Sequence, residues 1–219
     1  MYLLPLTFFK SGEHYNRDTD NIQFFGAIDL NLIKKINCYA SAFIDEISID
    51  KFFQSDDGRK QVGFTVGLQT FDLFLNNVEV LIEYTRLNPW VYSHKYTAAT
   101  FTNNGYVIGH WIGQNADNLF VDLTFRPSRQ LKVGAFYESF RRGVTKTVNY
   151  QYDSSQRMSF LEPPVRKEYS IGGYGKYQFI RDGFLEFRIR SFKLTDNQNP
   201  SFSHSNRTEF FLSLGYGIW

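Results

Sequence analysis

The sequence predicts an all-β fold, an antiparallel up-and-down β-barrel that spans a membrane with its strands. Three observations predict it. Segments of about ten residues alternate apolar and polar side chains, short and long links alternate between them, and the last segment runs to the aromatic Trp219. We find no domain boundary, so residues 1–219 are expected to form a single β-barrel domain or the C-terminal portion of one.

Nine segments follow a period of two, which is typical of strands with one apolar and one polar face. In order they are Ile22–Leu32, Asn37–Ile47, Gln61–Thr70, Val78–Arg86, Asn118–Arg126, Leu131–Phe140, Glu168–Phe179, Phe184–Leu194 and Thr208–Ile218. Tyr2–Lys10 is a candidate for a tenth. The residues that share one face are Ile22, Phe24, Ile28 and Leu30 in the first, Val62, Phe64, Val66 and Leu68 in the third, Val78, Val80, Ile82 and Tyr84 in the fourth, and Leu119, Val121, Leu123 and Phe125 in the fifth.

The links between these segments alternate strictly in length. Short links that suit tight turns lie at Ile33–Ile36, around Phe74–Asn77, at Pro127–Gln130 and at Ile180–Gly183. Long links lie at Asp50–Lys60, Leu87–Asp117, Gly143–Lys167 and Thr195–Arg207. A soluble β-sandwich with Greek-key connections has no reason to keep this order, although its strands would show the same alternation. The alternation of link lengths therefore favours the barrel.

Charged side chains indicate which face meets lipid. Lys or Arg on the lipid face at mid-membrane costs about 2–4 kcal/mol. Glu186, Arg188 and Arg190 alternate with apolar neighbours, so their row is expected to face the lumen. The predicted lumen charges are Glu79, Glu83, Asp122, Arg126, Lys132, Glu138, Lys176, Glu186, Arg188 and Arg190. Both signs occur in similar numbers, which favours a mutually neutralised interior over a strongly selective pore.

Composition excludes several classes. The net charge of +2 gives no support for nucleic-acid binding, and the single Cys38 cannot form an intramolecular disulfide. The four histidines are scattered, so we expect no metal site and no cofactor. No apolar run approaches the ~20 residues of a transmembrane helix. Residues 1–10 lack the features of a secretory signal, which leads us to expect a mature segment or a fragment of an exported protein.

Several stretches resemble a known family. "EYTRLNPWVYSH" (83–94) followed by "IGHWIGQNADNLFVDLTFRP" (108–127) is similar to the C-terminal half of the capsule-assembly Wzi family in its Bacteroidetes-type form. "FFKSGEHYNRDTDNIQFFGAIDLNL" (8–32) and "AFIDE" (42–46) fit the same pattern. The resemblance covers most of the chain. It implies an outer-membrane barrel of about eighteen strands, of which this chain supplies roughly half. It also implies a role in attaching capsular polysaccharide to the cell surface.

The long link after the fourth strand holds the candidate glycan-binding residues. They are Asn88, Trp90, Tyr92, His94, His110, Trp111, Asn115 and Asp117, with Asn118 beside them. Aromatic faces stack on pyranose rings, and amide or carboxylate groups bind sugar hydroxyls. Alternatively, the aromatic residues belong to an interfacial girdle and the Asn and Asp residues form ordinary turns.

The sequence contains none of the G-x-S-x-G, P-loop or H-E-x-x-H motifs, so we expect a binder without enzymatic activity. The alternatives are a channel for small solutes and, with less support, a barrel hydrolase acting on lipids. The expected partners are outer-membrane lipid, surface or capsular polysaccharide and, through the C-terminal strand 210–219, the barrel-assembly machinery. The expected location is the outer membrane of a Gram-negative bacterium.

Overall fold

The computed structural model describes residues 23–46, 61–72, 75–96, 100–104, 106–146, 158–199 and 204–217. Within these ranges, nine strands form one antiparallel sheet in the order β1-β2-β3-β4-β7-β8-β9-β10-β11. Their bounds are β1 Phe24–Ile33, β2 Ile36–Glu46, β3 Gln61–Phe71, β4 Val78–Leu87, β7 Ala116–Phe125, β8 Leu131–Arg142, β9 Arg166–Ile180, β10 Gly183–Asp196 and β11 His204–Tyr216. The predicted all-β antiparallel meander is confirmed.

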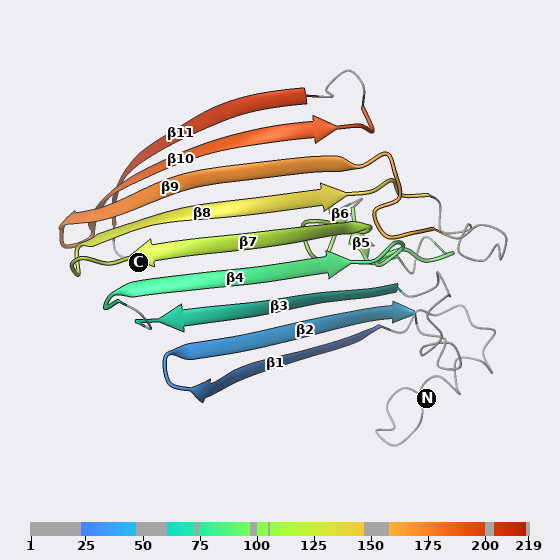
Figure 1. The fold of residues 1–219 in the computed structure, drawn as a ribbon, viewed down its shortest axis with the longest axis horizontal. Helices are drawn as coiled ribbons and strands as arrows, with labels where there is room; N and C mark the ends of the chain where they lie inside the picture. The colour runs from blue at the N-terminus through green and yellow to red at the C-terminus, as the bar shows by residue number, and fades with distance from the viewer. Residues whose placement is uncertain are drawn as a thin grey trace.

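The sheet is open. Among the described residues β1 pairs with β2 alone and β11 with β10 alone, so both are edge strands. The predicted closure into a barrel is therefore not seen, although the sheet curves along β9, β10 and β11 (Figure 1). All four short turns lie at one end of the sheet and the long links at the other (Figure 1). The sheet thus has a short-turn end and a long-loop end, as the alternating link lengths predict.

Two of the short turns join strands through two residues. Lys35 (φ 70°) and Asp182 (φ 66°) adopt the left-handed conformation that tight hairpins require. Asp72 organises a third turn, because its carboxylate accepts a hydrogen bond from the Asn77 backbone N–H at 2.5 Å. Its backbone carbonyl accepts another from the Lys35 ammonium at 2.6 Å. This contact ties two neighbouring turns together.

The register separates an apolar face from a polar face of the sheet. One row of directly paired residues on the apolar face consists of Leu30, Cys38, Leu68, Ile82, Val121, Tyr137 and Ile171. Large side chains on this face are exposed, Ile171 by 64% and Leu212 by 72%. The charged row Glu186, Arg188 and Arg190 lies on the opposite face. The side-chain alternation predicted for these strands is confirmed.

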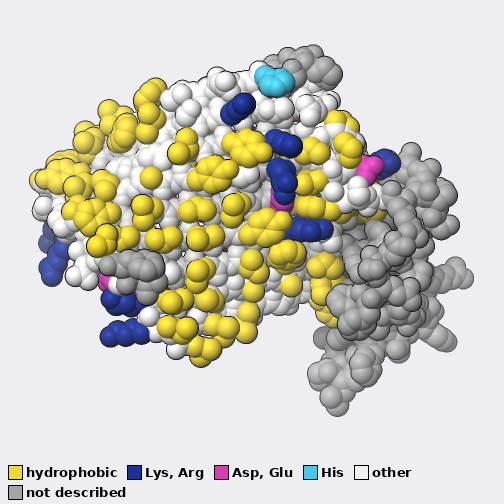
Figure 2. Space-filling view, viewed as in Figure 1, with side chains coloured by type: hydrophobic (Ala, Val, Ile, Leu, Met, Phe, Trp, Pro, Cys, Tyr) yellow, Lys and Arg dark blue, Asp and Glu magenta, His cyan; other side chains and the backbone are white. Residues whose placement is uncertain are grey.

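Basic residues cross the apolar face close to the long-loop end. Arg86, Asp117, Arg141 and Lys167 are paired in one row, and Lys193 pairs with Tyr169 next to it. We call Arg86, Arg141, Lys167 and Lys193 the basic row. Figure 2 shows Lys and Arg side chains crossing this face, with hydrophobic side chains on both sides of them. The face therefore carries a row of mostly basic residues close to its long-loop end.

Aromatic side chains on the polar face cover glycines of neighbouring strands. The Tyr39 ring lies over Gly67, and its hydroxyl donates to Glu83 at 2.5 Å on the next strand. Tyr174 covers Gly134 in the same way. Its hydroxyl hydrogen-bonds Asp122 at 2.9 Å. Each tyrosine thus ties three adjacent strands together.

Several strands extend beyond the predicted bounds. β7 begins two residues earlier, β9 begins at Arg166, β10 ends at Asp196, and β11 begins at His204. The alternation stops where both faces become polar, but the hydrogen-bonded ladder continues. Tyr2–Lys10, Ile22, Ile47, the whole predicted link Asp50–Lys60 and residues 218–219 lie outside the described residues. No helix in the described ranges is long and apolar enough to cross a membrane.

Candidate functional site

The described part of the β4–β7 link, residues 88–96, 100–104 and 106–115, folds over the polar face at the long-loop end. Tyr92 packs on Phe43 with ring centroids 5.1 Å apart, and Trp111 packs on Phe140 at 5.6 Å. Phe43 and Phe140 both project from the polar face of the sheet. Leu87, Val91, Tyr92, Ile112, Ala116 and Phe140 form the buried core beneath the loop. The core of the described structure therefore lies between this loop and the sheet.

A short hairpin within the loop was not predicted. It pairs β5 (Thr102–Asn103) with β6 (Tyr106–Val107). The dipeptide Asn104–Gly105 between them is the usual sequence signal for a two-residue hairpin. Phe101 anchors the hairpin, since its ring stacks on Tyr92 at 5.5 Å. The pattern search missed it because each strand is only two residues long.

Two of the aromatic candidates, Trp90 and Tyr92, are buried within the loop. Trp90 is 1% exposed, and its indole N–H donates to the Lys146 carbonyl at 3.3 Å. The Tyr92 N–H donates to the Asp45 carboxylate at 2.8 Å, while its hydroxyl accepts from the His110 N–H at 3.1 Å. Burial raises the pKa of the Tyr92 hydroxyl. The Trp90 ring therefore offers no free face to a sugar, and the Tyr92 ring is covered in large part by Phe43 and Phe101.

Both residues also have positive φ angles, 62° at Trp90 and 75° at Tyr92. Bulky side chains rarely adopt this conformation, so the surrounding packing must hold it.

Asn115 and Asp117 hold the loop to the strands. Asn115 is fully buried; its amide donates to the Val144 carbonyl at 2.7 Å and accepts from the Leu161 N–H at 2.8 Å. Asp117 accepts two hydrogen bonds from the Arg141 guanidinium and one from the Tyr84 hydroxyl. Asp117 lies in the row of the apolar face, whereas Asn115 ties three loop segments together. Both contacts are structural in character.

The remaining candidates differ in accessibility. Asn88 accepts from the Arg86 guanidinium at 3.1 Å, and His94 accepts from the Tyr96 N–H at 3.2 Å. His110 is half-buried, and its Nδ1 accepts from the Ile112 N–H at 3.4 Å. Burial lowers the pKa of His110, and the charge of Glu83 opposes that shift.

Trp111 stands apart from the other aromatic candidates, because its side chain is 62% exposed. It borders a cavity of about 380 Å³ on the polar face, which we call the arginine pocket. Besides Trp111, the walls contain the Phe140 ring, the Ser170 hydroxyl and two carboxylates, Glu138 and Glu168. Three guanidinium groups complete them, those of Arg142, Arg166 and Arg190. A volume of this size lies in the range of small-ligand pockets.

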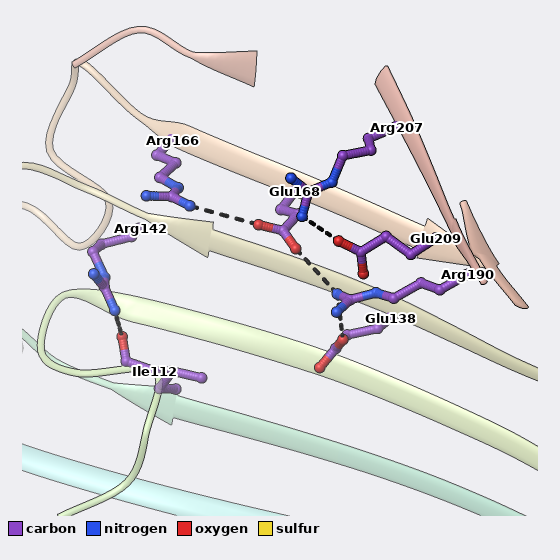
Figure 3. Close-up of polar contacts among 8 residues, drawn as sticks. All are labelled: Ile112, Glu138, Arg142, Arg166, Glu168, Arg190, Arg207 and Glu209. Atoms are coloured by element: carbon purple, nitrogen blue, oxygen red, sulfur yellow. Dashed lines mark hydrogen bonds and ion pairs between the residues drawn. The ribbon is translucent and has the colours of Figure 1, made fainter. Parts of the chain in front are cut away.

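Ion pairs fix most of the charged groups of the arginine pocket (Figure 3). Arg190 lies between Glu138 at 3.3 Å and Glu168 at 3.1 Å. The other oxygen of Glu168 is 3.6 Å from Arg166. Arg142 instead donates to the Ile112 carbonyl through both Nε, at 3.1 Å, and Nη2. These side chains come from the long-loop ends of three adjacent strands and converge on one place.

The other predicted lumen charges lie on the polar face nearer the short-turn end. Arg126 pairs with Glu79 at 3.1 Å, and Lys176 pairs with Glu186 at 2.6 Å. Lys132 lies over the Tyr174 ring. Arg188 has no carboxylate partner within the described part of the chain. Except for Lys132 and Arg188, each of these charged side chains forms an ion pair with a group of opposite charge or a hydrogen bond.

A second cavity, of about 440 Å³, lies at the same end of the sheet on the other side of the loop. Phe25, Phe43, Phe101 and Tyr92 supply aromatic walls, and His110 reaches its border. Of the predicted residues, the fold brings Trp111, Glu138 and Arg190 together in the arginine pocket, and Tyr92 and His110 together at this second cavity.

Sequence reasoning did not select Arg142, Arg166, Glu168 and Ser170 as site residues. Glu168 and Ser170 lie within the predicted segment Glu168–Phe179, on its polar face. Arg142 and Arg166 lie beyond the predicted strand ends, and extending the alternation to the ends of β8 and β9 would have found them.

Within the described ranges, no three His, Cys, Asp or Glu side chains are grouped as a metal site. No family model matches the chain, and no curated protein or solved structure is significantly similar to it. The resemblance to the Wzi family stays a prediction from the sequence.

Proposed function

We propose that this chain forms part of an outer-membrane β-barrel that binds surface or capsular polysaccharide without enzymatic activity. The observation that carries the proposal is the division of the sheet into two faces. The apolar face exposes large hydrophobic side chains on every strand of the nine-stranded sheet except β2, and the polar face holds ion pairs and the arginine pocket. In water, an exposed apolar face of this extent would promote aggregation, whereas the hydrocarbon chains of a membrane accommodate it favourably.

The edge of the apolar face supports the membrane assignment. Tyr84 and Tyr169 lie on the apolar face in the row next to the basic row. Aromatic residues and Lys or Arg are favoured where hydrocarbon gives way to lipid headgroups. In this proposal the long-loop end faces outward, as long loops do in barrels of this kind. The open edges of β1 and β11 pair with further strands, because unpaired backbone groups cost several kcal/mol each in lipid.

The glycan is held at the outward end of the polar face. Trp111 offers an exposed ring beside the arginine pocket, and guanidinium, carboxylate and hydroxyl groups surround the cavity. Sugar binding needs this combination of an aromatic platform and directional hydrogen-bonding groups. Of the candidate aromatic residues, Trp111 is therefore the one we propose as a sugar contact.

Cell fractionation and polysaccharide retention test the two parts of the proposal separately. We expect the chain to remain in the outer-membrane fraction after alkaline carbonate washing; recovery as a soluble protein would refute the membrane assignment. In the same cells, Trp111→Ala should reduce surface-polysaccharide retention several-fold because the stacking surface is lost. Trp111→Phe keeps an aromatic ring and should retain most of the polysaccharide. Equal retention by Trp111→Ala and the native chain would exclude Trp111 as an anchor.

A further inference from the structure

The arginine pocket contains hydrogen-bond donors that have no partner. Ser170 is 3% exposed, and its Oγ makes no hydrogen bond within the described structure. The Nε groups of Arg166 and Arg190 are likewise buried and unpartnered there. Buried polar groups in folded proteins are nearly always paired, so a cluster of three unpaired groups in one cavity wall calls for an explanation. Both Nε groups can only donate, and the hydroxyl can donate as well, so the complementary group is an acceptor.

The charge of the cavity wall points the same way. Three guanidinium groups face two carboxylates. Glu168 is shared between Arg190 at 3.1 Å and Arg166 at 3.6 Å, so among the described residues Arg166 has only a distant carboxylate partner. Arg142 has no carboxylate partner among the described residues; it donates to the Ile112 carbonyl and lies 5.2 Å from the centre of the Phe140 ring. The pocket therefore carries an excess of positive charge and favours an anionic acceptor.

The aromatic wall limits the shape of that acceptor. Trp111 and Phe140 have ring centroids 5.6 Å apart, and the exposed Trp111 ring adjoins the cavity. A bare inorganic anion would leave this ring unused. A pyranose ring carries C–H groups that pack on an aromatic face, together with hydroxyl oxygens that accept hydrogen bonds.

We propose that the arginine pocket recognises a carboxylated sugar unit, a hexuronate, within the bound glycan. This inference rests on the proposed glycan-binding function and adds the chemical class of the ligand. The uronate carboxylate accepts hydrogen bonds from Arg166 and Arg142, for which the planar guanidinium group is well suited. A ring hydroxyl accepts from Ser170, and the pyranose ring packs against Trp111. Arg190 remains the bridge between Glu138 and Glu168 that holds the pocket together.

The test compares sugars that differ only at the carboxylate. The probes are oligomers of galacturonate, glucuronate and mannuronate, each with a counterpart whose carboxyl groups are reduced to primary alcohols. Binding to the purified full chain in detergent is followed by tryptophan fluorescence. A charge-assisted contact of this kind corresponds to about a ten- to hundred-fold difference in Kd. We expect at least one uronate oligomer to bind that much more tightly than its reduced counterpart, with a preference that weakens at high salt.

Variants assign the preference to the pocket. Arg166→Gln should remove most of the preference for the uronate, and Arg166→Lys should restore part of it by returning the charge. Ser170→Ala should weaken uronate and reduced oligomer alike, because it removes a hydroxyl contact. Arg126→Gln is the matched control: Arg126 lies on the polar face near the short turns, pairs with Glu79 and should bind like the native chain. Unchanged fluorescence and circular dichroism spectra would show that the variants fold.

The possible outcomes separate this inference from the proposal on which it rests. Equal binding of uronate and reduced oligomers would overturn the carboxylate preference and leave glycan binding intact. If Arg166→Gln keeps the preference for the uronate, the carboxylate is recognised outside the arginine pocket. That result would also overturn the inference. Failure of every acidic and neutral oligomer to bind would refute both.

Discussion

Replacing Asn115 by glycine should loosen the loop that forms the candidate site. Asn115 is fully buried and has a φ angle of 54°. Its side chain donates to the Val144 carbonyl at 2.7 Å and accepts from the Leu161 N–H at 2.8 Å. Its backbone carbonyl also accepts from Gly143 at 2.9 Å. The side-chain amide thus joins the β4–β7 loop to both ends of the β8–β9 loop.

The expected magnitude follows from the two hydrogen bonds. Asn115→Gly leaves one part-buried carbonyl and one part-buried N–H without these partners, at about 1–3 kcal/mol each. The expected loss is therefore about 2–6 kcal/mol of local stability. Its lower end already makes opening of this region about thirty-fold more frequent. Asn115→Ala should be worse by about 1 kcal/mol, because alanine is strained at positive φ and glycine is not. This reverses the usual preference for alanine over glycine.

Hydrogen exchange followed by mass spectrometry measures the effect. Peptides covering residues 141–146 and 158–165 should exchange faster in Asn115→Gly and faster still in Asn115→Ala, while the β9–β10 turn peptide should not change. Asn206→Ala, an exposed position on β11, serves as the control. If Asn115→Gly leaves the protection of both loop peptides at the native level, the amide does not hold the loops together. If alanine is tolerated better than glycine, the backbone argument fails.

Two further perturbations follow from the geometry. Gly67→Ala should lower the free energy of unfolding by about 1–3 kcal/mol, because its Cβ would overlap the Tyr39 ring. Urea titration measures this loss. Gly26→Ala is the control, because its Cβ meets nothing within 4 Å and its stability should stay near that of the native chain. Burial lowers the pKa of His110, and its neutral Nδ1 accepts from the Ile112 N–H. The stability contributed by the neutral His110 side chain is therefore fully present above the ordinary histidine pKa of about 6.5. It is lost as the pH falls toward the lowered pKa of His110. The exchange protection of the Ile112 amide should accordingly fall as the pH is lowered below about 6.5; the same fall in His110→Gln would contradict this origin.

The strands could be predicted because each is decided locally by alternation. Val62, Phe64, Val66 and Leu68 share a face in any register, so the period of two identifies the strand without its neighbours. The same rule underestimates strands where both faces become polar. Lys167 and Arg166 break the alternation at the start of β9, although the ladder with β10 extends to Asp196. Hydrogen bonding, rather than side-chain pattern, sets that boundary.

The site could be predicted only in part, because it depends on contacts between distant segments. The sequence placed the candidate glycan-binding residues in the β4–β7 link, and one of them, Trp111, lies at a cavity. Nothing local distinguishes Trp111 from Trp90, yet one is 62% exposed and the other 1%. Positive φ angles at Trp90 and Tyr92 run against residue preference and are held by tertiary packing. A sequence pattern carries no signal for such a loop path.

The path of the loop nevertheless determines what the pocket can recognise. Ile112 is fully buried in the core beneath the loop, so the residue before it, Trp111, is fixed against Phe140. The carbonyl of Ile112 also accepts the hydrogen bonds of Arg142. One buried residue therefore positions both the aromatic platform and one of the guanidinium groups of the arginine pocket. Small shifts of Ile112 should alter stacking and charge recognition together, so the two contributions to sugar binding should prove coupled rather than additive.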